Sequence, residues 1–163
     1  MSNFDLSPYS ILFVDDEGFT RQIVVQLLRS LGCVNVRQAS NVSQALHVLK
    51  EMDKVHIIIS DFRMPEDNGL KLVKEVRTGN ASVNRGTPIA MLTGFSEKSL
   101  VEVALALDVN AFLVKPVSRN GLGDRLQRLL EITADQSWLS TPALYDRIDV
   151  DVVITPPHFP RST

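Results

Sequence analysis

The sequence predicts an α/β domain in which five parallel strands alternate with five helices, a (βα)5 arrangement followed by a C-terminal extension. Two observations point to this fold class. Short apolar runs rich in Ile, Val and Leu recur along the chain, as is typical of strands buried on both faces. The segments between these runs carry apolar residues at helical spacing, which favours crossover helices that join parallel strands.

The apolar runs give the expected positions of the strands. They lie at about residues 10–14, 34–39, 55–60, 88–92 and 111–114. The helices are expected between and after them, at about residues 19–31, 42–52, 69 onward, 97–107 and 119–132. Right-handed crossovers with helices on both faces then favour a doubly wound, flavodoxin-like sheet with strand order 2-1-3-4-5. Strands two and five should be the edges, and the alternating polarity of residues 34–38 suits an edge strand.

Local signals mark several element boundaries. Gly32 is expected to end the first helix, since glycine readily adopts the left-handed conformation that follows a helix. Ser40 or Asn41 is expected to cap the second helix. Residues 79–86, rich in Gly, Asn and Ser, read as an exposed loop.

The repeating pattern stops after Ile132, so we divide the chain into a domain of residues 1–132 and an extension of residues 133–163. Within the extension, Thr141 and Pro142 predict the N-cap and first residue of a short helix. Apolar and acidic residues alternate over residues 148–154, a weak strand signal. Because Trp138 and Tyr145 are too apolar for a solvated linker, we expect the extension to cover an edge strand or the surface around the fifth helix. It is interpreted as an arm for a homodimer or another partner.

Composition narrows the possible partners and setting. A net charge of −2 gives no indication of nucleic-acid binding or of a membrane-surface protein. Cys33 is the single cysteine, so no internal disulfide can form. No signal peptide or membrane-length apolar segment is seen, and a cytoplasmic location is expected.

Polar residues follow four of the expected strands. Asp15 and Asp16 follow the first strand, Asp61 the third, Thr93 the fourth and Lys115 the fifth. Because the carboxyl ends of parallel strands form one rim, these side chains should meet there. Three neighbouring carboxylates repel one another and suit Mg²⁺, while a hydroxyl and an ammonium can hold phosphoryl oxygens. The set predicts phosphoryl transfer to an aspartate.

Four motifs carry a resemblance to a known family. They are Ile-Leu-Phe-Val-Asp-Asp-Glu at residues 11–17, Ser-Asp-Phe-Arg-Met-Pro at 60–65, Met-Leu-Thr-Gly at 91–94 and Phe-Leu-Val-Lys-Pro at 112–116. Over roughly residues 9–132 the chain resembles the receiver domain of two-component response regulators, in particular the single-domain receivers of chemotaxis. The resemblance implies a signalling phosphoprotein rather than an enzyme with an external substrate.

The resemblance also assigns roles to individual residues. It implies that Asp61 accepts a phosphoryl group from a sensor histidine kinase or phosphotransfer protein. Asp16, Asp61 and the main-chain carbonyl of Arg63 would bind Mg²⁺, with Asp15 acting mainly through water. Thr93 and Lys115 would contact the phosphoryl group.

The same resemblance implies a switch and a cis peptide. Thr93 and Phe112 would move together on phosphorylation and remodel the face of strands and helices four and five for a downstream protein partner. Phe112 lacks a hydroxyl, so such a switch would depend on burial of its ring. A cis bond is expected before Pro116. Asp108 occupies a helix-end position where such receivers often have glycine.

Two alternatives differ in function. One is a degenerate receiver that acts as a constitutive interaction module, which retention of the acids, Thr93 and Lys115 disfavours. The other is a metal-dependent phosphohydrolase, which would want a second acid shortly after the nucleophile. Arg63 stands there instead.

Overall fold

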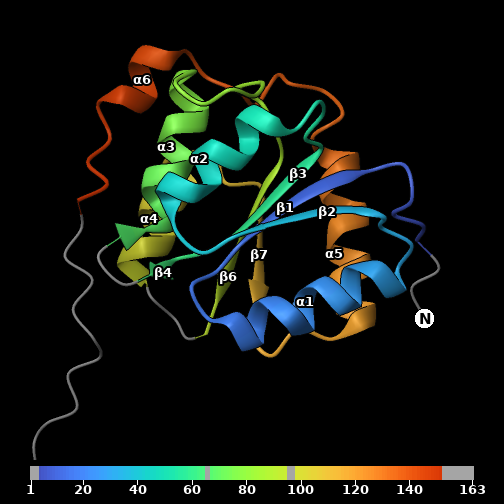
Figure 1. Cartoon of the computed structure of the whole chain (residues 1–163). Coiled ribbons are helices and arrows are strands. Elements are labelled where there is room, and N and C mark those ends of the chain that lie inside the picture. The colour runs from blue at the N-terminus through green and yellow to red at the C-terminus, as the bar shows by residue number, and fades with distance from the viewer. Residues whose placement is uncertain (1–3, 65–66, 95–97, 152–163) are drawn as a thin grey trace, which may run out of the picture.

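A five-stranded parallel sheet forms the centre of the protein in a computed structural model that describes residues 4–64, 67–94 and 98–151 (Figure 1). The strands are β1 (Ser10–Val14), β2 (Asn35–Ala39), β3 (Ile57–Asp61), β6 (Ile89–Thr93) and β7 (Ala111–Val114). Their order is β2-β1-β3-β6-β7, and every pairing is parallel. The predicted 2-1-3-4-5 order is confirmed, with β6 and β7 as the fourth and fifth strands of this sheet.

Helices cover both faces of the sheet (Figure 1). On one face lie α1 (Gly18–Ser30) and α5 (Arg119–Ile132), and on the other lie α2 (Val42–Glu51), α3 (Gly69–Thr78) and α4 (Lys98–Ala106). Side chains of successive strand residues point to opposite faces. Accordingly, Leu12 and Val14 belong to the apolar core under α2 to α4, whereas Ile11 and Phe13 belong to the core under α1 and α5.

Most predicted boundaries are within two residues of the observed ones. Asn41, rather than Ser40, caps α2, and its side chain accepts a hydrogen bond from the Gln44 amide at 2.7 Å. Gly32 follows α1 in the left-handed region with φ 98°. The predicted start of the fourth helix at Glu97 lies outside the described residues. No helix in the described part of the chain is long and apolar enough to cross a membrane.

A short antiparallel pair that the sequence did not predict follows β3. It consists of β4 (Arg63–Met64) and β5 (Asp67–Asn68), with Arg63 opposite Asn68. Two-residue strands are too short to produce a periodic pattern, so no strand was predicted between residues 60 and 69. The pair folds the segment after Asp61 back toward the start of α3.

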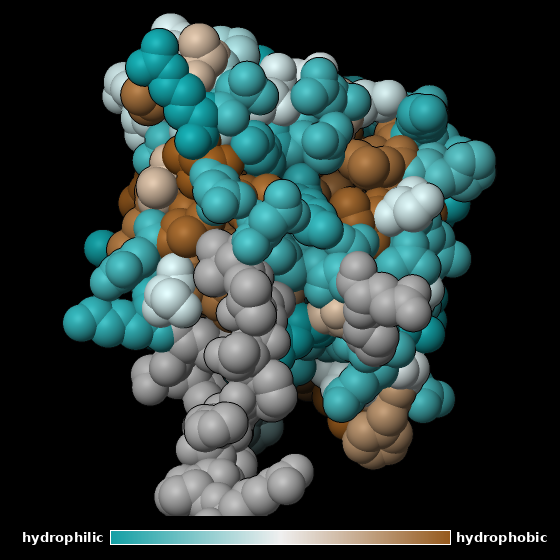
Figure 2. Space-filling model, turned by 90° about the vertical axis from the view of Figure 1, so that its left-hand side faces the viewer, coloured by the Kyte–Doolittle hydropathy of each residue, from teal (hydrophilic) through white to brown (hydrophobic). Residues whose placement is uncertain are grey.

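The C-terminal extension packs on its own domain, against α3. The short helix α6 (Pro142–Asp146) has Thr141 at its N-cap and Pro142 at its first position, as predicted. The expected docking at an edge strand or around α5 was wrong, because the described part of the extension contacts α3 and the loop before β6. Tyr145 is fully buried there. Figure 2 shows this side of the molecule, on which polar side chains predominate between separate hydrophobic patches.

The alternating segment at the end of the extension is not a strand in its described part, residues 148–151, while residues 152–154 lie outside the description. Ile148 and Val150 pack against the core under α3, and Asp149 and Asp151 are exposed. The alternation therefore reflects an extended segment lying along a helix with one side buried. That the extension serves as an arm for a homodimer or another partner stays a prediction.

Candidate functional site

The C-terminal ends of four parallel strands bring the predicted polar residues to one rim. Asp61 is the last residue of β3 and Thr93 the last of β6, while Asp15 and Asp16 follow β1 and Lys115 follows β7. One carboxylate oxygen from each of the three aspartates lies within 4.8 Å of the others. The structure thus gathers acids from two neighbouring strands that are 46 residues apart in the chain (15 to 61).

Asp15 lies at the buried end of the acidic cluster and is fixed by its neighbours. Its Oδ1 accepts a hydrogen bond from the Glu17 amide at 2.9 Å, and Arg21 Nη1 donates to its main-chain oxygen at 2.6 Å. Its Oδ2 is buried and accepts no hydrogen bond within the described residues. Lys115 Nζ lies 3.8 Å from this oxygen. Sequence analysis missed the partly buried Arg21, because nothing in the local sequence distinguishes it from helical arginines that face solvent.

Burial of Asp15 disfavours its charged form. Burial raises the pKa of Asp15 to about 6, the charges of Asp61 and Asp16 add to the rise, and the Glu17 amide and Lys115 oppose it. A buried carboxylate oxygen without a donor, beside two further carboxylates, leaves negative charge uncompensated. An oxygen-rich set of this kind suits a hard divalent cation such as Mg²⁺. The residues present therefore fit the metal that the sequence predicts.

Lys115 holds Asp61 from the opposite side of the rim. Its Nζ donates a hydrogen bond to Asp61 Oδ2 at 2.9 Å. Burial disfavours the ammonium, but the hydrogen bond and the charges of Asp61 and Asp15 outweigh it and raise the pKa of Lys115. The Lys115–Pro116 bond is cis, as the resemblance implied. The Lys115 amide also donates to the Thr93 carbonyl at 2.8 Å, which joins the two strand ends.

The segment after Asp61 returns very close to it. The Arg63 amide lies 3.4 Å from Asp61 Oδ1, and the Gly69 amide donates to the Phe62 carbonyl at 2.9 Å. A Cβ at position 69 would lie 2.1 Å from the Asp61 carbonyl oxygen, so only glycine fits. By contrast, a Cβ at Gly94 would meet no described atom within 4 Å, so the open space beside Thr93 does not require glycine at this position.

The two residues of the predicted switch lie on neighbouring strands. Thr93 is partly buried at the end of β6, and Phe112 is opposite Met91 in β7, two positions before the residue that pairs with Thr93. The Phe112 ring is partly buried and stacks on Phe62, with ring centroids 6.3 Å apart. Phe62 directly follows Asp61, so the stack connects Phe112 with the acidic rim. Sequence analysis gave Phe62 no role.

An apolar pocket adjoins the rim on the side of α1. It has a volume of about 450 Å³, and Lys115 contributes to its wall. The other lining residues are Phe19, Thr20, Ile23, Val24, Leu92, Gly94, Pro116 and Val117. Two of the apolar members face solvent, with exposed fractions of 75% for Phe19 and 40% for Ile23. The pocket thus places apolar surface beside the charged centre.

The raised pKa of Asp15 gives a testable pH dependence of stability. The folded state binds this proton at higher pH than the unfolded chain does. The contribution of the protonated Asp15 carboxyl to stability is therefore fully present below pH 3.8, the ordinary pKa of aspartate, and is lost as the pH rises through about 6. In metal-free buffer, Asp15→Asn should unfold at a higher temperature than the wild type at neutral pH. The difference should shrink as the pH is lowered through about 6. Thermal unfolding of both proteins across this range checks it, and a difference independent of pH would contradict it.

Comparison with known proteins gives a consistent result. The sequence model of the response regulator receiver domain matches residues 11–127. A chemotaxis protein CheY homolog of Campylobacter jejuni is 36% identical over 120 residues, which cover 74% of this chain and 91% of that protein. Chemotaxis protein CheY1 of Helicobacter pylori strain J99 is also 36% identical over 120 residues, with coverages of 74% and 95%.

A solved structure agrees with these sequence matches. Chemotaxis protein CheY4 of Vibrio cholerae matches with a TM-score of 0.68 and 33% identity, over 75% of this chain and 98% of that one. The matched part of the sequence includes every strand of the central sheet except the first residue of β1. On this evidence the chain belongs to the family of response regulator receiver domains and is a relative of the chemotaxis receivers of the CheY type.

Proposed function

We propose that this receiver domain accepts a phosphoryl group on Asp61 from a phosphohistidine of a sensor kinase or phosphotransfer protein. The observation that carries the proposal is the pairing of Asp61 with Lys115 at 2.9 Å beside the acidic cluster. An Asp61 carboxylate oxygen attacks phosphorus, the phosphorus–nitrogen bond to the donor imidazole breaks, and the imidazole leaves with its electron pair and takes up a proton. The product is an acyl phosphate.

The other rim residues hold and neutralise the transferred group. Lys115 contacts a phosphoryl oxygen with its ammonium, and the Thr93 hydroxyl donates to another. Asp16, Asp61 and the main-chain carbonyl of Arg63 would hold Mg²⁺, with Asp15 reaching it through water. When bound, the ion supplies positive charge to the phosphoryl oxygens. The complete burial of Asp15 and the hydrogen bond from Glu17 to its Oδ1 support this indirect role.

The signal then passes to a downstream protein through the surface of β6, β7, α4 and α5. Contact of Thr93 with the phosphoryl group pulls the end of β6 toward Asp61. The Phe112 ring, stacked on Phe62, adjusts its burial with that movement. Exposed apolar side chains on this surface, including Leu105 and Val114, offer a partner apolar area to bury on binding.

Intact-mass measurement tests the proposed function directly. The protein is incubated with a small acyl-phosphate donor and Mg²⁺, and one phosphoryl group per chain is expected. Excess chelator should prevent the mass change, since the acids then keep their uncompensated charge. An unchanged mass with Mg²⁺ present, or steady hydrolysis of an external phosphoester in place of one stoichiometric addition, would refute it.

The pocket beside Lys115 provides a docking point for the phosphodonor protein. A donor histidine must approach Asp61 across the rim, and the exposed Phe19 ring lies next to that approach. Phe19→Ser should slow transfer from a phosphorylated donor protein about tenfold at subsaturating concentration, because an exposed aromatic anchor is lost. Transfer from a small acyl-phosphate donor should be unchanged, since such a donor needs no docking surface.

Val34→Ser is the matched control for this prediction. Val34 is 83% exposed, but it precedes β2 at the opposite end of the sheet. This variant should accept phosphoryl groups from both donors as the wild type does. Equal slowing by both substitutions, or slowing of the small donor by Phe19→Ser, would show that the pocket is not the docking point.

A further inference from the structure

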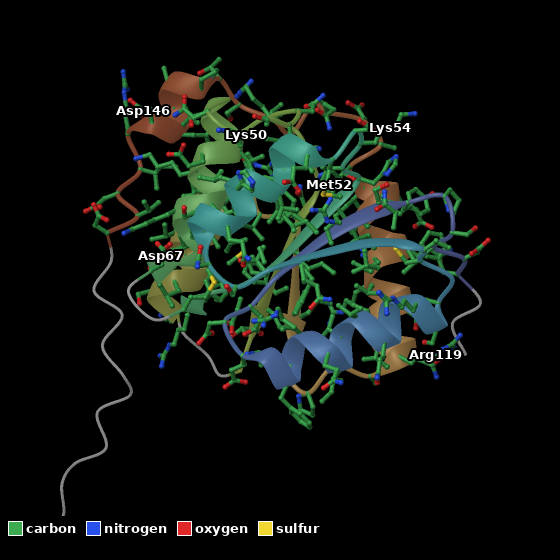
Figure 3. The ribbon with its side chains drawn as sticks, in the orientation of Figure 1. Lys50, Met52, Lys54, Asp67, Arg119 and Asp146 are labelled. Atoms are coloured by element: carbon green, nitrogen blue, oxygen red, sulfur yellow. The ribbon has the colours of Figure 1, made fainter. Side chains whose placement is uncertain are left out.

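The described part of the extension after α5, residues 134–151, forms a strap along α3. Near its start, Gln136 Nε2 donates to the Gly86 carbonyl at 3.0 Å, and the Trp138 ring lies 4.8 Å from the guanidinium carbon of Arg77. Figure 3 labels Asp146 and Asp67, which lie near opposite ends of α3. The strap runs between these two ends, from α6 toward the rim that bears Asp61.

At the rim end the strap is fastened by donors on α3 and at its N-cap. Asn68 Nδ2 donates to the Val150 carbonyl at 2.8 Å in a buried setting. Lys74 Nζ donates to the Ile148 carbonyl at 2.7 Å. Lys71 Nζ adds an exposed ion pair with Asp151 at 3.6 Å. The strap therefore follows the first turns of α3, next to the segment that follows Asp61.

Asn68 joins three parts of the molecule. Its Oδ1 caps α3 by accepting from the Leu70 and Lys71 amides at 2.8 and 3.3 Å, while its Nδ2 binds the strap. It is only 5% exposed, and it is the last residue of β5, where it lies opposite Arg63 of β4. Val150 and Met64 belong to the same apolar cluster, so the strap and the β4–β5 pair share one core.

We propose that the strap positions the β4–β5 pair, residues 63–64 and 67–68, for the rim chemistry, with Asn68 as the positioning residue. The inference rests on the proposed function, in which the main-chain carbonyl of Arg63 faces the metal. Groups that orient metal ligands from outside contribute strongly to affinity. The β4–β5 pairing and the burial of Phe62 and Met64 already hold this part of the chain. The Asn68–Val150 hydrogen bond adds an attachment directly opposite Arg63, which further limits movement of the Arg63 carbonyl.

Asn68→Asp separates the strap contact from the helix cap. Aspartate is an equally good N-cap, but it has no amide to donate to Val150. Mg²⁺ affinity, measured by calorimetry on the unphosphorylated protein, should fall about tenfold. The added negative charge by itself would attract Mg²⁺, so a loss of affinity can come only from altered geometry. Amide hydrogen exchange within the β4–β5 pair should be faster in this variant than in the wild type.

Three further proteins complete the experiment. Asn68→Ser keeps a capping oxygen without added charge, and its Mg²⁺ affinity should fall by the same factor. It also replaces Asn68→Asp in the experiment if that variant fails to fold. A chain ending at Asp151 keeps the strap contacts and should bind Mg²⁺ like the wild type. Tyr145→Phe removes the hydroxyl that bonds Asp108 and Ser140 at the far end of the strap. It should lower the unfolding temperature and leave Mg²⁺ affinity unchanged.

The outcomes separate this inference from the proposed function. Unchanged Mg²⁺ affinity and exchange in both Asn68 variants would overturn the positioning role while phosphorylation of the wild type stands. Equal weakening by Tyr145→Phe would overturn it too, because the effect would then follow general stability. Absence of Mg²⁺ binding in the wild type also overturns it. A wild type that binds Mg²⁺ but never gains a phosphoryl group refutes the proposed function alone.

Discussion

Asp61→Asn is expected to abolish phosphorylation while the fold remains intact. The amide has nearly the same shape as the carboxylate but lacks a nucleophilic oxygen, so no stable acyl phosphate can form. Loss of one charge also relieves repulsion from Asp15, which lies at ligand distance in the same cluster. The change also weakens the ion pair with Lys115, so the two effects oppose each other and the stability of the folded state should stay close to that of the wild type in metal-free buffer. Intact-mass analysis with a small acyl-phosphate donor and thermal unfolding check the two halves of this expectation.

The control for this variant is Asp53→Asn. Asp53 is exposed in the turn between α2 and β3, away from the rim, and receives the same chemical change. It should be phosphorylated like the wild type. Undiminished acyl phosphate in Asp61→Asn would show that another residue is the phosphoacceptor. Asp16 would be the next candidate, because it is partly exposed in the same cluster.

The sheet and its rim were predictable because their signals are local. Each strand of the central sheet is a short apolar run, and its parallel neighbours follow from the helices between the runs. Once the order is known, residues at strand ends must converge, which is why Asp15, Asp61 and Lys115 were placed together correctly. Their separation along the chain did not matter, because topology alone brings the strand ends to one edge.

The docking of the extension could not be predicted in the same way. The alternation of residues 148–151 reports only that one side is buried and does not identify the surface that buries it. We took it as strand addition, whereas the chain lies along α3, where Lys74 and Asn68 supply donors for its carbonyls. Such donors are common polar residues of a helix and its cap, and nothing in their spacing distinguishes them from solvated ones.

Arg77 shows most clearly that the sequence does not reveal the buried partners of a polar side chain. A charged residue on a helix is expected to face solvent, yet Arg77 has no exposed surface. Its acceptors belong to two loops beyond α3, at residues 85–87 and 107–110. One of these is Asp108, whose left-handed backbone has φ 56°. The departure from glycine at this position has a physical reason, since the Asp108 carboxylate accepts a hydrogen bond from Tyr145 at 2.7 Å.

Replacement of Arg77 by methionine should be the most destabilising single substitution of those considered. All five guanidinium donors are used, each in a hydrogen bond of 2.7 to 3.1 Å. The acceptors are the carbonyls of Leu107, Arg85, Thr87 and Asp108 and the side-chain oxygen of Asn110. Methionine keeps much of the apolar volume but removes these donors, and among the five oxygens Asn110 Oδ1 keeps a hydrogen bond from the Ile89 amide. Each unsatisfied buried group costs about 1–3 kcal/mol, so a total loss of about 3 kcal/mol or more is expected even after partial rehydration.

Lysine at this position should rescue little of the loss. Burial lowers the pKa of Arg77 to about 10, so the guanidinium stays charged at neutral pH. Lysine is also a cation, but its ammonium has three donors at one point and cannot span two loops as the planar guanidinium does. Rescue by lysine would show that charge, including the contact with the Trp138 ring, matters more than the hydrogen-bond geometry.

Urea unfolding of matched variants measures these differences. Arg119→Met makes the same change at the exposed start of α5 (Figure 3), where the side chain donates to the Ser30 hydroxyl and carbonyl oxygens. It should change the free energy of unfolding by less than about 0.5 kcal/mol. In Arg77→Met the denaturation midpoint should fall with little change in the slope of the unfolding transition, provided that unfolding stays two-state. A free energy of unfolding within about 1 kcal/mol of the wild type would mean that water replaces the lost donors, and that the two loops are held in place by their own backbone contacts rather than by Arg77.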